Sequence, residues 1–204
     1  CVTGVQTCAL PILLREVVAG RDNVEVLHAD AGELDWTELG AKSAKWHVVA
    51  NLPYNVATPL VADILDGVPF VRHMLVMVQR EVAERFVAQP RTSAYGAVSV
   101  KVAYWSHARI VADVPATVFL PKPNVASALV EFHRRDEPAV SDVEPQELFS
   151  LVRTGFAQRR KMLRRSLAGL VSPEQFERAG VSSDCRPEEL DVATWGRLCR
   201  EVTS

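Results

Sequence analysis

Residues 51–54, Asn-Leu-Pro-Tyr, have the chemistry needed to hold and activate a flat ring that bears an amine. The lone pair of such an amine is delocalised into the ring, so a methylating site needs acceptors aimed at its N–H groups. The Asn51 side-chain oxygen and the Leu52 carbonyl oxygen are two candidates. Pro53 fixes φ and removes a competing donor, and a purine can stack on Tyr54 for roughly 1–3 kcal/mol. An ordinary strand-to-helix turn would use the same residue types.

The segment that must position these residues is 48–59, VVANLPYNVATP. A buried strand over 46–50 is predicted to run directly into the loop. Thr58 and Pro59 then predict a capping hydroxyl and the first residue of a helix over 59–65. Open α/β sheets bind ligands at the carboxyl ends of their strands, which is where this loop falls.

The rest of the chain alternates between strand and helix patterns. Strands are predicted over 24–27, 46–50, 74–78, 108–114 and 127–132, and helices over 59–65, 80–88 and 93–105. This rhythm predicts a doubly wound parallel sheet whose last two strands form an antiparallel edge pair. A charged segment with two prolines, 135–145, is interpreted as a linker. Residues 146–204 then predict a small all-helical domain, with helices beginning near Gln146, Pro173 and Pro187. Ser172 is the expected cap of the helix that begins at Pro173.

The beginning of the chain differs from the rest. There is no initiator Met, and residues 1–11 show no periodicity, whereas a helical pattern starts at Ile12 and ends at Gly20. We expect residues 1–11 to be foreign to the fold. The domain over 12–134 would then be truncated at its amino end.

Composition excludes several classes of protein. The net charge is −2 and the pI is near 6.2, so any nucleic-acid footprint must be local. The four cysteines form no CxxC pair and have no His at ligand spacing, which argues against structural zinc or disulfides and for a reducing cytosol. No membrane span or signal peptide is predicted. The five histidines show no shared face or spacing, so we assign them no catalytic role and expect no metal.

Several longer motifs occur in order along the chain. They are NLPYNVATPL, MVQREVAERF, YGAVSV, VFLPKPNVASALVEF, RRKMLRRSL and RPEELDVATWGRL. From residue 12 to the end, the chain resembles the ribosomal RNA adenine dimethyltransferase family. Its helical tail is more similar to the small-subunit (16S) enzymes than to the large-subunit resistance methylases. The resemblance implies a Rossmann-like class I methyltransferase sheet and S-adenosyl-L-methionine as the cofactor.

The resemblance also implies roles for particular residues. Asn51, Leu52, Pro53 and Tyr54 match the catalytic loop that holds the target adenine, and Asn51 borders the donor methyl. Phe119 matches the second aromatic, which packs on a flipped-out base. Asp30 matches the acidic residue that accepts from the cofactor's adenine amine, with the Ala31 backbone nearby. Without the resemblance, Phe119 would be interpreted as core packing and Asp30 as a helix cap.

A cluster of cations falls in the helical tail. Its members are Arg159, Arg160, Lys161, Arg164 and Arg165. Such a cluster is often only a solvated helix face, but beside a base-modifying domain it is better interpreted as a patch that contacts RNA phosphates. On the same helix, the side chains of Met162 and Leu163 are predicted to face the protein core.

Two elements of the family pattern have no match in this sequence: the glycine-rich loop after the first strand and the acidic residue after the second. We therefore expect the sheet to lack its first strands. We also expect this stretch to bind S-adenosyl-L-methionine poorly and to be inactive by itself.

The function implied is dimethylation of adenine amines in small-subunit (16S) rRNA during ribosome biogenesis, by a cytoplasmic monomer acting on a pre-30S particle, with no membrane partner. Three alternatives stay open. They are a non-catalytic rRNA-binding assembly factor, a large-subunit rRNA adenine methyltransferase, and a DNA or protein-amide methyltransferase with a similar loop.

Overall fold

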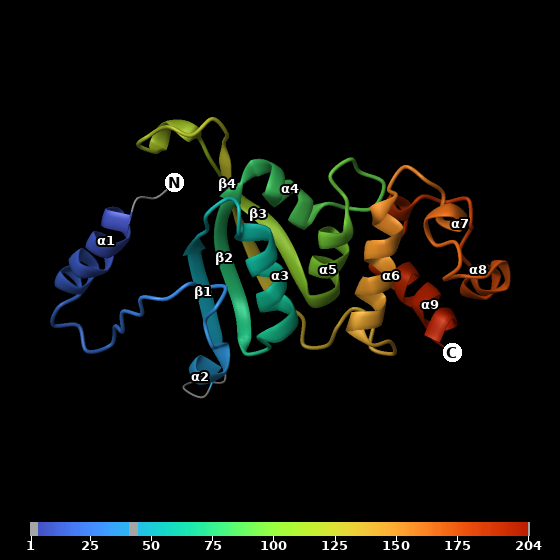
Figure 1. Ribbon diagram of the computed structural model, residues 1–204, viewed down its shortest axis with the longest axis horizontal. Coiled ribbons are helices and arrows are strands. Elements are labelled where there is room, and N and C mark those ends of the chain that lie inside the picture. Colours follow the sequence, from blue (N-terminus) through green and yellow to red (C-terminus); the bar gives the residue numbers. More distant parts are fainter. Residues whose placement is uncertain (1–3, 41–44, 204) are drawn as a thin grey trace. The chain divides into compact units, whose positions relative to one another are not determined.

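The computed structural model describes residues 4–40 and 45–203, and they fall into two compact units, 1–36 and 37–204 (Figure 1). The helices and strands are α1 (Gly4–Val17), α2 (Trp36–Gly40), β1 (Trp46–Asn51), α3 (Ala57–Gly67), β2 (Val71–Gln79), α4 (Arg80–Val87), α5 (Ala97–Trp105), β3 (Ser106–Val114), η1 (Ala116–Val118), β4 (Ser127–Arg134), α6 (Pro145–Ala157), α7 (Leu163–Ser166), α8 (Pro173–Ala179), η2 (Pro187–Glu189) and α9 (Val192–Thr203). None of the helices in this described part combines the length and the apolar character that a membrane span requires.

The second unit is built on a mixed four-stranded sheet with the order β1-β2-β4-β3. β1 and β2 run parallel, whereas β4 is antiparallel to both β2 and β3. The predicted antiparallel pair is therefore confirmed. The other two described strands, β1 and β2, are parallel as predicted, and β4 joins them to the edge strand β3.

One face of the sheet carries the core. Helices α3, α4 and α5 pack on it (Figure 1), and its side chains alternate along each strand with more exposed ones. Phe86 of α4 meets Phe132 of β4 edge to face, with ring centroids 5.4 Å apart. The opposite face is more open: Val49 is 79% exposed. The prediction that β1 is a buried strand is thus only half correct, because β1 is the edge strand of the described sheet and only one of its faces is covered.

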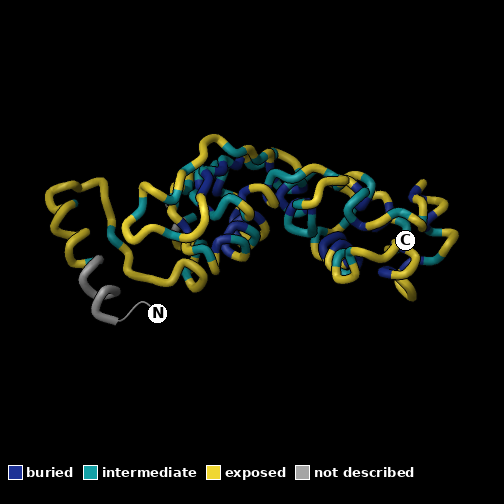
Figure 2. The backbone as a smooth tube through the Cα atoms, turned by 90° about the horizontal axis from the view of Figure 1, so that it is seen from above, coloured by how far each residue is buried: buried dark blue, intermediate teal, exposed yellow. Residues whose placement is uncertain are grey.

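A second core gathers the helices of the carboxyl-terminal part with the last helix of the sheet layer (Figure 2). Tyr95, before α5, and Tyr104, within it, pack into the same cluster as Trp195 of α9. A Cβ at Gly155 would lie 2.6 Å from the Trp195 ring, so α6 and α9 approach too closely for any other residue there. Segment 135–144 has no helix or strand, and its backbone bonds to the end of α5. Residues 37–204 therefore behave as one compact unit.

The first unit departs most from prediction. α1 begins at Gly4, although helical pattern was expected only from Ile12, and residues 1–3 of the predicted foreign segment lie outside the described residues. Of the residues on the apolar side of that pattern, Leu13, Leu14 and Val17 are about half exposed or more, and Val18 is partly exposed. No strand forms at 24–27: these residues have no ladder partner in the described chain, and a strand cannot form without one.

The starts of three helices also differ. α3 begins at Ala57 with Val56 at the cap and no capping side chain, so Thr58 does not cap the helix. α5 begins at Ala97 instead of Ser93, because residues 90–94 form turns. Pro187 opens a single 3-10 turn, and the last helix starts at Val192. The cap at Ser172 is confirmed, with Gln175 N donating to its hydroxyl at 3.3 Å.

Candidate functional site

The candidate site lies at the edge of the sheet where the parallel strands β1 and β2 end. Because β4 is antiparallel to β2, its first residue, Ser127, sits opposite Gln79 at the end of β2. The connection from β3 to β4 therefore crosses the same edge. It carries Phe119, far away in sequence from the 51–54 loop, to the side of the sheet where that loop lies.

Residues 51–54 begin at the last residue of β1 and carry two oxygens without a hydrogen-bond partner among the described residues. The Leu52 N–H donates to the Met77 carbonyl at 3.2 Å, and this bond ties the loop to β2. The Pro53 carbonyl accepts from Val56 and Ala57, which starts α3. Among the described residues, none hydrogen-bonds to the Asn51 amide or to the Leu52 carbonyl. Both acceptors of the predicted kind therefore lack a partner in the described part of the chain.

Tyr54 is held at the site by its hydroxyl. Its Oη lies 2.8 Å from Oγ of Ser127, and either atom can be the donor. Ser127 is only 1% exposed, so the bond joins a buried hydroxyl of β4 to a half-buried ring of the loop. The contact limits the positions that the ring can occupy, and it links the 51–54 loop to the β3–β4 connection.

An open pocket of about 320 Å³ is lined by both segments. Its walls are Asn51, Leu52, Pro53, Tyr54, Phe119, Pro121 and Pro123. Every residue predicted for the target base therefore borders one cavity. Its volume is at the low end of the roughly 300–1,000 Å³ typical of small-molecule sites. Two aromatic rings, two free acceptors and a wall of prolines suit a flat ring with an exocyclic amine.

The residues predicted for the cofactor lie partly in the first unit. One carboxylate oxygen of Asp30 accepts from the Gly32 N–H at 2.8 Å, and the Asp30 carbonyl accepts from Glu33 N at 3.1 Å. Asp30 and Ala31 are both exposed. Asp30 thus shapes a turn with one carboxylate oxygen, and no described residue bonds to the other. Asn51 belongs to the second unit.

The five cations do not share one helix as predicted. α6 ends at Ala157, a turn covers 158–160, and the short α7 starts at Leu163. Leu163 is fully buried as predicted, but Met162 is 40% exposed because it lies outside the helix. Arg159 is hydrogen-bonded within the protein: its guanidinium donates to Glu188 at 2.6 Å and to the Ser93 carbonyl at 2.7 Å.

The remaining cations are more exposed. Arg164 pairs with Asp184 at 3.2 Å, with both side chains more than half exposed. Arg160, Lys161 and Arg165 are exposed and make no ion pair within the described chain. Of the five cations in the predicted patch, four are therefore exposed. The centre of this patch is the turn between α6 and α7.

The prediction that the five histidines share no face is wrong for four of them. His47, His73, His133 and His107 occupy directly paired positions on β1, β2, β4 and β3. They form a row across the open face, and Glu131 lies next to it, two residues before His133. Partial desolvation raises the pKa of the Glu131 carboxyl, but hydrogen bonds from Arg109 and His73 lower it by a larger amount. The net shift of this pKa is therefore downward. Only strand pairing, which spacing along the chain does not show, could reveal this row.

The sheet order, the helices on one face and the loop at the carboxyl edge are those of a Rossmann-like class I methyltransferase fold. Two solved structures share it. A dimethyladenosine transferase from Plasmodium falciparum matches with a TM-score of 0.74 at 22% identity, over 92% of this chain and 75% of that one. The 23S rRNA methyltransferase ErmE matches with a TM-score of 0.67 at 23% identity, over 96% and 79%. At these identities the likeness shows the fold alone.

Sequence comparisons are more specific. The family model described as "Ribosomal RNA adenine dimethylase" matches residues 9–203. The ribosomal RNA small subunit methyltransferase A of Geobacillus thermodenitrificans is 39% identical over 202 residues, which are 93% of this chain and 69% of that protein. The protein of the same name from Kineococcus radiotolerans is 42% identical over 200 residues, 92% of this chain and 65% of that one. The chain belongs to the ribosomal RNA adenine dimethylase family.

Proposed function

We propose that this chain carries the base-binding and methylating loop of an enzyme that dimethylates the exocyclic amine of adenines in small-subunit (16S) rRNA. The observation that supports this most is the pocket shared by the 51–54 loop and Phe119. Its lining residues Asn51 and Leu52 carry two acceptors that have no partner in the described part of the chain. Membership of the family and relatives named for the small subunit add to it.

The chain's own residues would act on the amine by position. The two N–H groups of the adenine amine donate to the Asn51 side-chain oxygen and the Leu52 carbonyl. These bonds draw the nitrogen toward tetrahedral geometry and aim its lone pair at the donor methyl. Tyr54 and Phe119 hold the flipped base between them, which replaces the stacking that the base loses on leaving its helix. The extra proton passes to solvent after transfer, so no carboxylate pair is needed.

The cofactor of this chemistry is S-adenosyl-L-methionine, which supplies the methyl group as an electrophile when bound. The residues present fit part of such a ligand. Asp30 has a carboxylate oxygen beyond the one that Gly32 occupies, suited to an adenine amine, and the Ala31 backbone lies beside it. Asn51 is the residue that would face both the cofactor methyl and the target base.

We propose that residues 12–134 carry the chemistry and residues 146–204 contact rRNA, with 135–145 between them. Arg160, Lys161, Arg164 and Arg165 would meet phosphates of the pre-30S particle, because exposed cations release counterions when they bind RNA. Arg159 would instead position the turn through Glu188. A monomer at work in the cytoplasm, where ribosomes assemble, and without a membrane partner, fits this task.

The test is transfer of tritiated methyl groups to 30S particles that lack the modification. It is run at millimolar S-adenosyl-L-methionine, because weak binding of this cofactor is the reason that the sequence predicts an inactive stretch, and saturation with cofactor removes that block. Phe119→Ala should lower the rate by about 5- to 150-fold, the equivalent of one lost stacking contact. Leu120→Ala is the matched control, since Leu120 is the next residue and is fully exposed. Equal rates for these two variants would reject the role of Phe119.

The same assay separates the alternatives. An assembly factor without chemistry would bind 30S particles and transfer no methyl group. A large-subunit enzyme would label 23S rRNA in preference, and a DNA or protein methyltransferase would label neither. Our proposal predicts label in adenines of 16S rRNA as the dimethylated base.

A further inference from the structure

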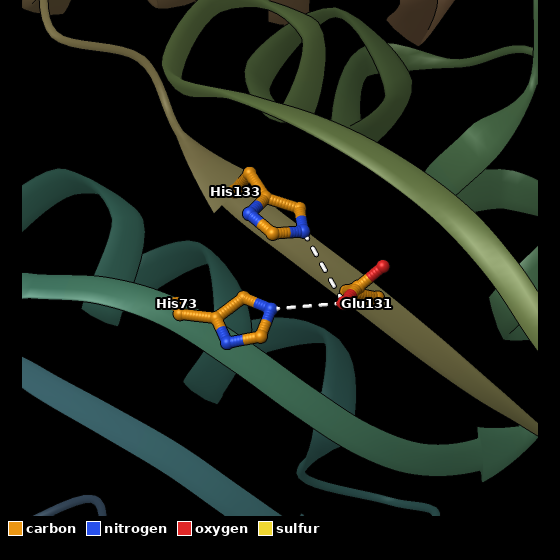
Figure 3. A group of neighbouring side chains, drawn as sticks. All are labelled: His73, Glu131 and His133. Atoms are coloured by element: carbon orange, nitrogen blue, oxygen red, sulfur yellow. Dashed lines mark hydrogen bonds and ion pairs between the residues drawn. The ribbon is translucent and has the colours of Figure 1, made fainter.

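The open face of the sheet brings together three side chains that can bind a metal ion. They are His73 on β2 and Glu131 and His133 on β4, and Figure 3 shows both imidazole rings directed toward one carboxylate oxygen. Nε2 of His73 lies 3.0 Å from Oε1 of Glu131, and Nε2 of His133 lies 3.2 Å from the same atom. One donor atom from each residue fits within 4.8 Å of the others. None of the three lines the pocket described above.

We infer that His73, Glu131 and His133 form a binding site for a divalent transition metal, with Zn²⁺ as the best match. Zinc bonds to imidazole nitrogen and carboxylate oxygen at about 2.0–2.2 Å, so tetrahedral ligands lie roughly 3.3 Å apart. The two measured distances are close to this spacing. Two imidazoles and one carboxylate are also a donor set that zinc accepts in sites with an open fourth position.

Two neighbouring residues orient the ligands, as the outer shell of a metal site does. Arg109 donates to Oε2 of Glu131 from Nε at 2.7 Å, which leaves Oε1 to face the two histidines. Nδ1 of His73 lies 3.3 Å from Nδ1 of His47. If His73 donates a proton there, its Nε2 lone pair is free to bind the metal. These two hydrogen bonds hold the Glu131 and His73 side chains in orientations that suit metal binding, which chance contacts between surface side chains would not do.

The group is open to solvent on one side, so a metal ion can reach it. The side chain of His133 is 56% exposed, that of His73 29% and that of Glu131 16%. The carboxylate is thus partly shielded while one imidazole faces solvent, where water could complete the coordination. Because the ligands belong to two paired strands, the metal would join β2 to β4 at the end of the sheet away from the 51–54 loop.

The experiment is calorimetric titration of the 204-residue chain with zinc chloride. We expect one saturable site, lost or weakened more than about 100-fold in His73→Ala and in His133→Ala, since even outer-shell changes cost about 10–100-fold. His47→Ala changes an outer-shell residue, so it should weaken zinc binding by about 10- to 100-fold. His107→Ala is the matched control, because this histidine is in the same row but outside the group of three, and it should bind zinc as the unchanged protein does.

Two further measurements keep the test decisive if a variant is less stable. Zinc should raise the melting temperature of the unchanged protein and of His107→Ala but not of His133→Ala. Cobalt(II) should give visible absorption of a tetrahedral site without a thiolate charge-transfer band, which excludes the cysteines as ligands. The absence of saturable binding would overturn the proposal. So would equal zinc affinity in His73→Ala, His133→Ala and His107→Ala.

Discussion

The hydrogen bond between Tyr54 and Ser127 supports the position of one wall of the pocket, and a double-mutant cycle can measure its strength. Tyr54→Phe removes the partner of a hydroxyl that is buried on β4. An unsatisfied buried group costs about 1–3 kcal/mol, so the variant should lose about 1–2 kcal/mol of unfolding free energy. Ser127→Ala should cost less, about 0.5–1 kcal/mol, because the half-exposed tyrosine hydroxyl can turn to water.

The double variant removes both polar groups and should cost less than the sum of the single changes. We expect a coupling free energy of about 0.5–1.5 kcal/mol from urea unfolding followed by circular dichroism, with unchanged m-values. A coupling below about 0.3 kcal/mol would show that the bond is not made in solution and would refute the reasoning. In methyl transfer, Tyr54→Phe keeps the stacking ring and should lose little, whereas Tyr54→Ala should lose about 5- to 150-fold.

Three other predictions concern buried or hydrogen-bonded residues elsewhere in the second unit. Arg134 donates to the carbonyls of Ile64, Leu65 and Val68 at the end of α3, and Arg134→Met should cost about 2–4 kcal/mol in urea unfolding. Burial raises the pKa of the Asp191 carboxyl, but hydrogen bonds from Thr194 lower it by more. The stabilisation from Asp191 is full above the unfolded pKa of about 3.9 and is lost as pH falls through the folded value. The unchanged protein should therefore exceed Asp191→Asn in unfolding free energy at neutral pH, and urea unfolding at a series of pH values should show this difference shrink in acid. Burial raises the pKa of the Cys199 thiol to about 11, so it should react with a disulfide reagent only as the protein unfolds, as peptide mapping would show.

The sequence predicted the elements around the site well, because their signals are local. Apolar runs and their lengths placed β1, α3, β2 and α4 within a few residues, and the Ser172 cap was predicted from its own chemistry. The same local reasoning failed at 24–27, where an apolar run has no described strand beside it.

Contacts between distant residues could not be predicted in this way. Arg159 is an exposed cation in any local pattern, and only the fold brings Glu188 to it. The histidine row depends on the register of four strands, which spacing along the chain does not encode. Phe119 was assigned to the base by resemblance to a family, and the β3–β4 connection shows how it reaches the pocket.

The most direct test of the central claim is single-turnover methylation of 30S particles by the unchanged protein and by Asn51→Ala, with particle binding measured beside it. Removing one well-placed polar group from a reacting centre typically costs about 100- to 1,000-fold in rate. We expect a loss of that size in Asn51→Ala with affinity for the particle unchanged. Full methylation by Asn51→Ala would contradict the account, because the amine would then be activated without the acceptor that the pocket provides.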